Sequence, residues 1–212
     1  MIVIAISGWK NSGKSTLCRE LLKIISETGL KVGYIKRTNE NTASPDSTDT
    51  GAAAALGFPS LLWGADSLRY ESANRNAASA DPRALAAAAF PDADIVLLEG
   101  GKNLKLPRVW VLGENETPPT DDKITGIFAY YDRFGSGDEN DRYGAGDVRR
   151  LASRLTGMAR QGARSARVYI DNDELPLNEF VADFMAGAVR GMLGSLKNPK
   201  GLSGGIKVYV KD

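Results

Sequence analysis

The sequence has no histidine, and Cys18 is its single cysteine. Without histidine there is no imidazole to act as a general base, as a metal ligand or as a member of a nucleophilic triad. A single cysteine cannot form a disulfide within the chain, and without histidine it does not make a zinc site. We therefore expect Cys18 to be a buried thiol, and we expect carboxylates, lysines or water to carry any acid–base chemistry.

Long apolar runs and excess charge are also lacking. No stretch approaches the ~20 apolar residues that a membrane span requires, and the short apolar run at residues 2–6 does not resemble a signal peptide. The formal net charge is +1, from 27 basic and 26 acidic residues, which gives no electrostatic reason to expect a nucleic acid or a membrane as partner. One α/β domain, with or without a small appendage, fits the length of 212 residues. We expect a cytoplasmic protein, because a chain that forms no disulfide suits a reducing compartment.

A glycine-rich motif near the start of the chain is the strongest functional signal. Residues 8–15 fit the pattern G-x-x-x-x-G-K-[ST] of a phosphate-binding P-loop, the Walker A motif. An apolar, β-branched run at residues 2–6 precedes the motif, and leucines and isoleucines near helical spacing follow it. Strand, glycine loop and helix are the context that the motif requires, so a chance match on an ordinary βα turn is the weaker interpretation.

Each part of this motif has a chemical reason. Gly8 and Gly13 allow the backbone to approach a phosphate chain closely, and the loop N–H groups and the helix N-terminus then face the anion. Lys14 adds a charge for the β- and γ-phosphates, and the Ser15 hydroxyl can bind the accompanying Mg²⁺. We therefore predict that a nucleoside triphosphate binds to Gly8, Trp9, Lys10, Asn11, Ser12, Gly13, Lys14, Ser15 and Thr16.

A carboxylate at the end of a second apolar run is the next candidate. Residues 31–36 predict the second strand of a right-handed βαβ unit, and residues 94–98 predict a buried strand that ends in Glu99 and two glycines. Because open α/β sheets bind ligands outside the carboxyl ends of their strands, we predict that Glu99 holds or orients Mg²⁺ and its water. A solvated carboxylate at a strand end is the alternative.

The polar segment at residues 40–50 contains a third candidate. Asp49 precedes an alanine-rich stretch that predicts a short helix ending near Gly57, so a helix N-cap is one interpretation of this carboxylate. The other is a switch-like loop in which Asp49 or Thr50 turns toward Mg²⁺ or the γ-phosphate. On the second interpretation Lys14, Glu99 and Asp49 form the catalytic set, and Ser15, Glu99 and Asp49 hold the metal.

The rest of the chain completes an α/β fold. We expect strands at residues 59–63, 68–70, 107–112 and 124–129, and helices at residues 84–89 and 148–155. The glycine- and acid-rich segment at residues 134–146 is expected to be a surface loop, or else a lid over the nucleotide. The predicted fold class is therefore α/β, with the three layers of a P-loop NTPase and a mostly parallel central sheet.

The C-terminal part of the sequence predicts a separate, small βαβ appendage. We place a P-loop nucleotide-binding domain at residues 1–157 and the extension at residues 166–212. Strands at residues 167–170 and 206–210 flank a helix that Asn178 caps. An apolar stripe on this helix is expected to pack on the extension's own strands, and a homodimer interface or a partner platform is the alternative.

The combination of motifs resembles the MobB family, the molybdopterin-guanine dinucleotide biosynthesis protein B. The resemblance covers roughly the first 110 residues and is carried by the segments Gly8-Trp9, Gly13-Lys14-Ser15-Thr16, Ile35-Lys36, Asp49-Thr50 and Asp94 to Gly100. The last of these is similar to the family's D-x-V-L-x-E-G strand. The family usually has Lys-His-Thr after the second strand, where this chain has Lys36, Arg37 and Thr38.

This resemblance implies a GTP-binding accessory factor that helps to attach a nucleotide to molybdopterin, with Mg²⁺ and slow hydrolysis. A molybdopterin nucleotidyltransferase is the partner that it implies. No N-K-x-D element specifies guanine, so ATP is the alternative nucleotide. Two other functions fit the same motifs: a small-molecule kinase, for which Arg37, Arg133 and Arg142 would cover the phosphates, and a non-catalytic scaffold that nucleotide orders.

Overall fold

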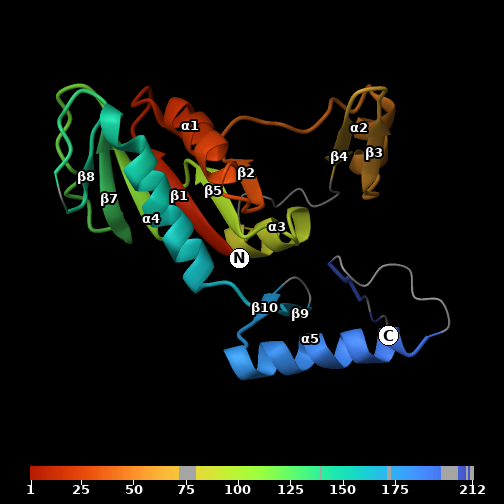
Figure 1. Ribbon diagram of the computed structural model, residues 1–212. Helices are drawn as coiled ribbons and strands as arrows, with labels where there is room; N and C mark the ends of the chain where they lie inside the picture. The colour runs from red at the N-terminus through yellow and green to blue at the C-terminus, as the bar shows by residue number, and fades with distance from the viewer. Residues whose placement is uncertain (72–79, 139, 171–172, 197–204, 209, 211–212) are drawn as a thin grey trace. The chain divides into compact units, whose positions relative to one another are not determined.

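The computed structural model describes residues 1–71, 80–138, 140–170, 173–196, 205–208 and 210 (Figure 1). The chain divides into two compact units, of which one comprises residues 1–37 and 82–212 and the other residues 38–81. The division that the sequence predicts, at residues 157–166, stays a prediction.

A six-stranded sheet is the centre of the first unit. Its strands lie in the order β2-β5-β1-β6-β7-β8, and every neighbouring pair is parallel. The strands are β1 (Ile2–Gly8), β2 (Val32–Lys36), β5 (Ile95–Glu99), β6 (Arg108–Leu112), β7 (Ile127–Asp132) and β8 (Arg142–Tyr143). The predicted α/β fold with a mostly parallel central sheet is therefore confirmed. The carboxyl ends of all these strands lie at one edge, the edge where such sheets bind ligands.

Helices cover both faces of this sheet (Figure 1). On one face lie α1 (Lys14–Ser26) and α4 (Val148–Gln161), and on the other lies α3 (Pro82–Ala89). Side chains alternate between the faces with the period of two that a strand imposes. In β1, Ile4 and Ile6 pack with α1 and α4, whereas Val3 and Ala5 pack with α3. The result is the three-layer arrangement that buried parallel strands require.

Cys18 lies in α1 and is 1% exposed, which confirms the predicted buried thiol. Burial, with the nearby charge of Glu99, raises the pKa of this thiol to about 12. Such a thiol stays protonated at neutral pH, and it packs as a small apolar group.

The second unit contains α2 (Asp49–Ala55) and a hairpin of β3 (Ser60–Trp63) and β4 (Leu68–Glu71). The N-cap of α2 is Thr48, whose side chain accepts a hydrogen bond from the Gly51 N–H at 3.1 Å. The capping role considered for Asp49 is therefore wrong. A hydroxyl one residue earlier has the extended backbone that a cap needs, and Asp49 is already helical.

The C-terminal segment contains β9 (Val168–Ile170), β10 (Asp173–Leu175) and α5 (Glu179–Gly194). As predicted, Asn178 caps α5, because its side chain accepts a hydrogen bond from the Val181 N–H at 2.9 Å. The strands form an antiparallel hairpin and not a βαβ unit, since so short a connection reverses the chain and cannot make the crossover that a parallel pair needs. The expected strand at 206–210 is not formed at residues 206–208 and 210, and Tyr209 lies outside the described residues.

Two elements have bounds that differ from the prediction by three residues or more. The strand expected at residues 124–129 runs from Ile127 to Asp132, because Gly126 has a φ of +76° and Ile124 packs against the sheet from the preceding turn. The helix expected to end near residue 155 continues to Gln161. Gly157 does not end the helix, because its φ is not in the left-handed region that a C-terminal cap glycine adopts. One glycine within a helix weakens it by only about 1 kcal/mol.

Over the part of the chain that the structure describes, no helix combines the length and the apolar character needed to cross a membrane.

Candidate functional site

The glycine-rich loop connects the central strand β1 to α1, as the motif predicts. Gly8 cannot carry a side chain, because a Cβ atom there would lie 2.4 Å from the Val111 carbonyl oxygen and 2.7 Å from Ser12 Oγ. Asn11 and Gly13 have φ values of +64° and +97°, in the left-handed region. The loop therefore folds back tightly on the end of β6.

The loop leaves backbone donors for a ligand. The N–H groups of Gly13, Lys14 and Ser15 donate to no acceptor among the residues that the structure describes. The Gly13 carbonyl accepts hydrogen bonds from the N–H groups of Thr16 and Leu17, each at 3.1 Å, which begins α1 directly behind them. Unpaired amides at the positive end of a helix form an anion-binding site.

Lys14 lies over this loop. Its Nζ donates to the Trp9 carbonyl and, at 3.4 Å, to Ser12 Oγ. Burial lowers the pKa of the Lys14 ammonium, and the carboxylates of Glu99 and Glu116 act in the opposite direction. The ammonium group thus has carboxylates nearby and neutral oxygens as its hydrogen-bond partners, which a phosphate can replace.

Glu99 is brought to the loop by the alternation of β5. Ile95 and Leu97 face α1, so Glu99, two residues further on, faces the start of the same helix. The Ser15 hydroxyl donates to Glu99 Oε1 at 2.6 Å, and the Tyr34 hydroxyl donates to Oε2 at 2.6 Å. Both carboxylate oxygens are therefore held by hydroxyl groups from other elements.

The charge of Glu99 is stabilised where it lies. Burial acts to raise the pKa of this carboxyl, but the hydrogen bonds from Ser15 and Tyr34 and the charges of Lys36 and Lys14 outweigh it and lower the pKa below its usual value. Lys36 Nζ is 3.8 Å from Oε1. Glu99 is 5% exposed, and it remains ionised at neutral pH.

The Ser15 and Glu99 side chains fit Mg²⁺. The ion prefers oxygen ligands and usually keeps several waters, with few protein ligands. The Ser15 hydroxyl donates its hydrogen to Glu99, so its lone pairs remain for a cation, and the adjacent carboxylate supplies negative charge. No cluster of three or more His, Cys, Asp or Glu side chains occurs in the described ranges, so a cation here would also need ligand oxygens such as phosphates.

The outer side of the loop is aromatic and basic. Trp9 is 38% exposed and meets Trp110 edge to face, with 5.7 Å between the ring centroids. Lys102, which follows the two glycines after β5, places its Nζ 4.2 Å from the centroid of the Trp9 ring. Lys10 and Thr16, also predicted to bind nucleotide, are exposed on either side of Gly13. The structure thus brings the predicted residues 8–16 together with Glu99.

The sequence did not single out Arg108, which the structure places next to the site. It is fully buried in β6, and its guanidinium donates to Ser7 Oγ and to carbonyls of the loops that precede and follow β6. The acceptors are Gly101 at 3.4 Å, Lys102 at 2.7 Å, Thr125 at 2.6 Å and Leu104. Arg108 therefore fixes the loop that follows Glu99. The sequence signal that could have identified it is a charged residue directly before the apolar run at residues 109–112.

The sequence also did not identify Tyr34 and Lys36 as site residues. They are two residues apart in β2, so their side chains lie on the same face of the strand, and both reach Glu99. Asp49 lies in the second unit, at the first residue of α2. Its part in catalysis and metal binding stays a prediction.

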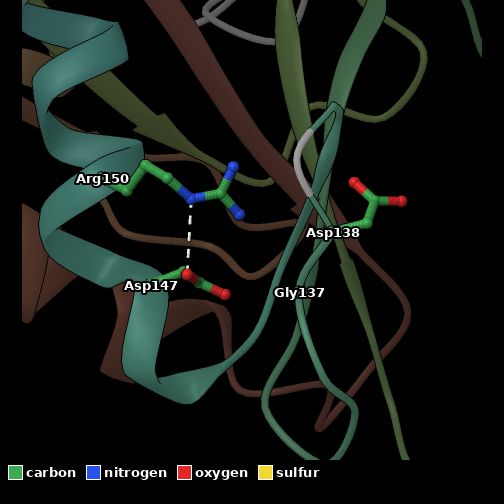
Figure 2. A pocket seen from close by; sticks show the side chains of 4 residues that line it. All are labelled: Gly137, Asp138, Asp147 and Arg150. Atoms are coloured by element: carbon green, nitrogen blue, oxygen red, sulfur yellow. Dashed lines mark hydrogen bonds and ion pairs between the residues drawn. The ribbon is translucent and has the colours of Figure 1, made fainter.

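An open pocket of about 390 Å³ lies beside the loop after β7, and Figure 2 shows the residues that line it, Gly137, Asp138, Asp147 and Arg150. The two carboxylates of this pocket accept hydrogen bonds from backbone N–H groups of their own loop. Asp138 accepts the Arg142 N–H at 3.0 Å, and Asp147 accepts the Gly144 N–H at 2.8 Å, which lowers the pKa of each carboxyl. These side chains stabilise the loop at residues 134–146, which is consistent with the predicted surface loop.

Comparison with known proteins gives one family and several solved structures. The family model for "Molybdopterin guanine dinucleotide synthesis protein B", MobB, matches residues 3–129. No curated protein matches the chain.

The structural neighbours carry the same name. A crystal structure of molybdopterin-guanine biosynthesis protein B has a TM-score of 0.58 and 20% identity, and the match covers 75% of this chain and 99% of that one. A MobB homolog from Bacillus stearothermophilus has a TM-score of 0.51 and 20% identity, over 76% and 99%. Bacillus subtilis MobB has a TM-score of 0.52 and 23% identity, over 73% and 98%. At such identities the likeness shows a shared fold.

Proposed function

Because this chain belongs to the MobB family, whose model covers more than half of its length, we propose that it is a GTP-binding accessory protein of molybdopterin guanine dinucleotide biosynthesis with slow, Mg²⁺-dependent hydrolysis. The family membership supports a role in this biosynthesis, and the choice of nucleotide and the turnover are our proposal. A nucleoside triphosphate would bind with its phosphates on the amides of Gly13, Lys14 and Ser15.

The observation that carries the proposal is the hydrogen bond from Ser15 to Glu99 directly beside those amides. A phosphate chain on the amides would lie next to an oxygen pair suited to Mg²⁺, with the Lys14 ammonium over the same loop. In such a site Ser15 and Glu99 would hold the cation, and the cation would neutralise charge on the phosphates. Asp49 stays proposed as a further metal or water ligand.

Slow turnover is consistent with the state of the Glu99 carboxylate. Glu99 is ionised and hydrogen-bonded through both oxygens, so it can orient a water molecule but is a weak base. Fast hydrolysis usually needs a more effective base for the attacking water. We therefore propose that nucleotide binding serves to present the nucleotide to a partner, a molybdopterin nucleotidyltransferase, more than to consume it.

The experiment measures phosphate release from GTP and from ATP, with and without Mg²⁺, and in parallel the formation of molybdopterin guanine dinucleotide by the nucleotidyltransferase with and without this chain. The proposal predicts slow release that needs Mg²⁺ and favours GTP, and faster dinucleotide formation when the chain is present. Transfer of phosphate to an added small molecule would instead support the kinase. Tight binding without any turnover would support the scaffold.

A further inference from the structure

Arg133 lies directly on the glycine-rich loop. If Gly13 carried a Cβ atom, that atom would lie 3.7 Å from Arg133 Cδ and 3.8 Å from Nη1. No other residue of the described chain comes within 4 Å of that position, apart from the sequence neighbours of Gly13. The guanidinium therefore covers the residue whose N–H begins the row of unpaired amides.

The strand alternation explains why this arginine points toward the loop. Ala129 and Tyr131 of β7 pack on the face that α1 covers, and Arg133 continues the same alternation just past the end of the strand. Asp132 then turns the chain, because its Oδ1 accepts the Phe134 N–H at 2.9 Å. The carboxyl end of β7 thus presents Arg133 at the edge where β1 presents the loop.

The guanidinium contacts an aromatic ring and its donors remain available. Its central carbon lies 4.4 Å from the centroid of the Phe134 ring, a cation–π contact. Among the described residues, no hydrogen bond or ion pair uses its five N–H donors. The side chain is exposed, so a ligand on the loop can reach it.

We propose that Arg133 is an arginine supplied by the chain itself that donates to the phosphates of the bound triphosphate and stabilises the charge that develops during hydrolysis. The inference rests on the proposed function, since it concerns the same site. In that reaction the oxygen of a water molecule bonds to the γ-phosphorus, and the bond from this phosphorus to the bridging oxygen breaks. The electron pair stays on the diphosphate, and the water's proton passes to the phosphate oxygens.

Arg133 lies past residue 129, where the match to the family model ends. An arginine in this role typically accelerates phosphoryl transfer by about 10³-fold or more, and it contributes less to ground-state binding.

The experiment compares Arg133→Ala and Arg133→Lys with the wild type in single-turnover hydrolysis and in nucleotide titration. We expect turnover to fall by at least about 100-fold in both variants, with the Kd for the triphosphate changing by less than about tenfold. Added guanidinium ion should partly restore turnover in Arg133→Ala. Arg149→Ala is the matched control, because Arg149 is 80% exposed on α4 and pairs with Glu27 at 4.0 Å.

A second measurement does not depend on turnover. It records how much Mg²⁺ with fluoroaluminate increases the affinity for the nucleoside diphosphate, since this complex mimics the transferring phosphoryl group. The wild type should gain affinity, and the Arg133 variants should lose that gain.

Hydrolysis in Arg133→Ala at a rate within about threefold of the wild type would overturn the inference. The inference would also fail if fluoroaluminate increased the affinity for the nucleoside diphosphate equally in both proteins, or in neither. A wild type that binds no nucleotide would instead contradict the proposed function.

Discussion

The Ser15 hydroxyl donates a hydrogen bond of 2.6 Å to Glu99 Oε1, across 84 residues of sequence. This contact joins the first turn of α1 to the end of β5, the two elements that meet at the centre of the sheet's carboxyl edge. It also places a hydroxyl oxygen and a carboxylate side by side next to the unpaired amides of the loop. The proposed metal and phosphate chemistry depends on this pair.

Replacement of Glu99 by glutamine should separate binding from turnover. Gln keeps the size of the side chain and an oxygen for Ser15, but it removes the negative charge near the cation. We expect Mg²⁺-dependent hydrolysis to fall by about 10²-fold or more, with triphosphate affinity reduced less than about tenfold. Single-turnover kinetics and nucleotide titration measure the two quantities.

Glu27→Gln is the control for that change, since Glu27 lies at the far end of α1 and is half-exposed. This variant should behave as the wild type does. Full hydrolysis in Glu99→Gln would show that Glu99 has no catalytic or metal-binding role.

Replacement of Tyr34 by phenylalanine should change how stability depends on pH. The hydrogen bond from Tyr34 helps to lower the Glu99 pKa, so its loss raises that pKa toward the ordinary 4.5. A carboxyl with a lowered pKa stabilises the folded state above its unfolded pKa, and this stabilisation disappears as the pH falls through the folded pKa. Tyr34→Phe should therefore be less stable than the wild type at pH 7, by about 1 kcal/mol, and the difference should narrow below about pH 4.5.

Urea unfolding at pH 7 and at about pH 3 tests this, with Tyr70→Phe as the control because Tyr70 is 67% exposed. An unchanged difference between wild type and Tyr34→Phe at the two pH values would show that the two side chains are not coupled.

The burial of Arg108 predicts a large loss of stability on its removal. Arg108→Met would keep an unbranched apolar stem but leave the carbonyls of Lys102, Leu104 and Thr125 without their donor. Each unsatisfied buried group costs about 1–3 kcal/mol, so we expect a loss of at least about 3 kcal/mol in the free energy of unfolding. Denaturant titration measures it, and the exposed Arg149→Met should stay within about 0.5 kcal/mol of the wild type. A loss below about 1 kcal/mol for Arg108→Met would contradict the role assigned to its hydrogen bonds.

A methyl group at Gly8 should deform the loop. The Val111 carbonyl oxygen, 2.4 Å from the new Cβ, belongs to the backbone of β6 and cannot move aside. We expect Gly8→Ala to weaken triphosphate binding by at least about tenfold. Gly157→Ala is the matched control, because nothing lies within 4 Å of a Cβ there and the helix should gain about 0.5–1 kcal/mol. Wild-type affinity in Gly8→Ala would argue against a rigid loop.

The local pattern was sufficient to predict the main elements of the site. The glycine loop lies between a buried strand and a helix, and Glu99 lies at a strand end. Both features could be predicted because they depend on the spacing of a few neighbouring residues. The three-layer α/β fold followed from the same alternation of strands and helices.

The partners of Glu99 could not be predicted in this way. Tyr34 and Lys36 reach it because β2 pairs with β5, in a register that sets Tyr34 beside Leu97 and Lys36 beside Glu99. A register between segments about sixty residues apart is fixed by the packing of the whole sheet and not by local sequence. The sequence offered Arg133 only as one of three candidate arginines. Its approach to Gly13 depends on the position of β7, two strands from β1 in the sheet.

The C-terminal segment shows a different limit. Hydrophobic alternation predicted a strand at residues 206–210, but short apolar runs form strands only where an edge is available for pairing. Residues 173–175, which follow β9 closely in the sequence, pair with it instead. The loop between them is short, so closing it costs less entropy than bringing residues 206–210 to β9 would.

The central claim is that the amides of the glycine-rich loop and the Lys14 ammonium bind a triphosphate. Isothermal titration of the chain with GTP and with ATP, each with Mg²⁺, tests it most directly when Lys14→Ala is titrated beside the wild type. The account predicts saturable heat for one site in the wild type, tighter with GTP, and no measurable binding in Lys14→Ala. Absence of heat with either triphosphate in the wild type, or the same Kd in the variant, would contradict it.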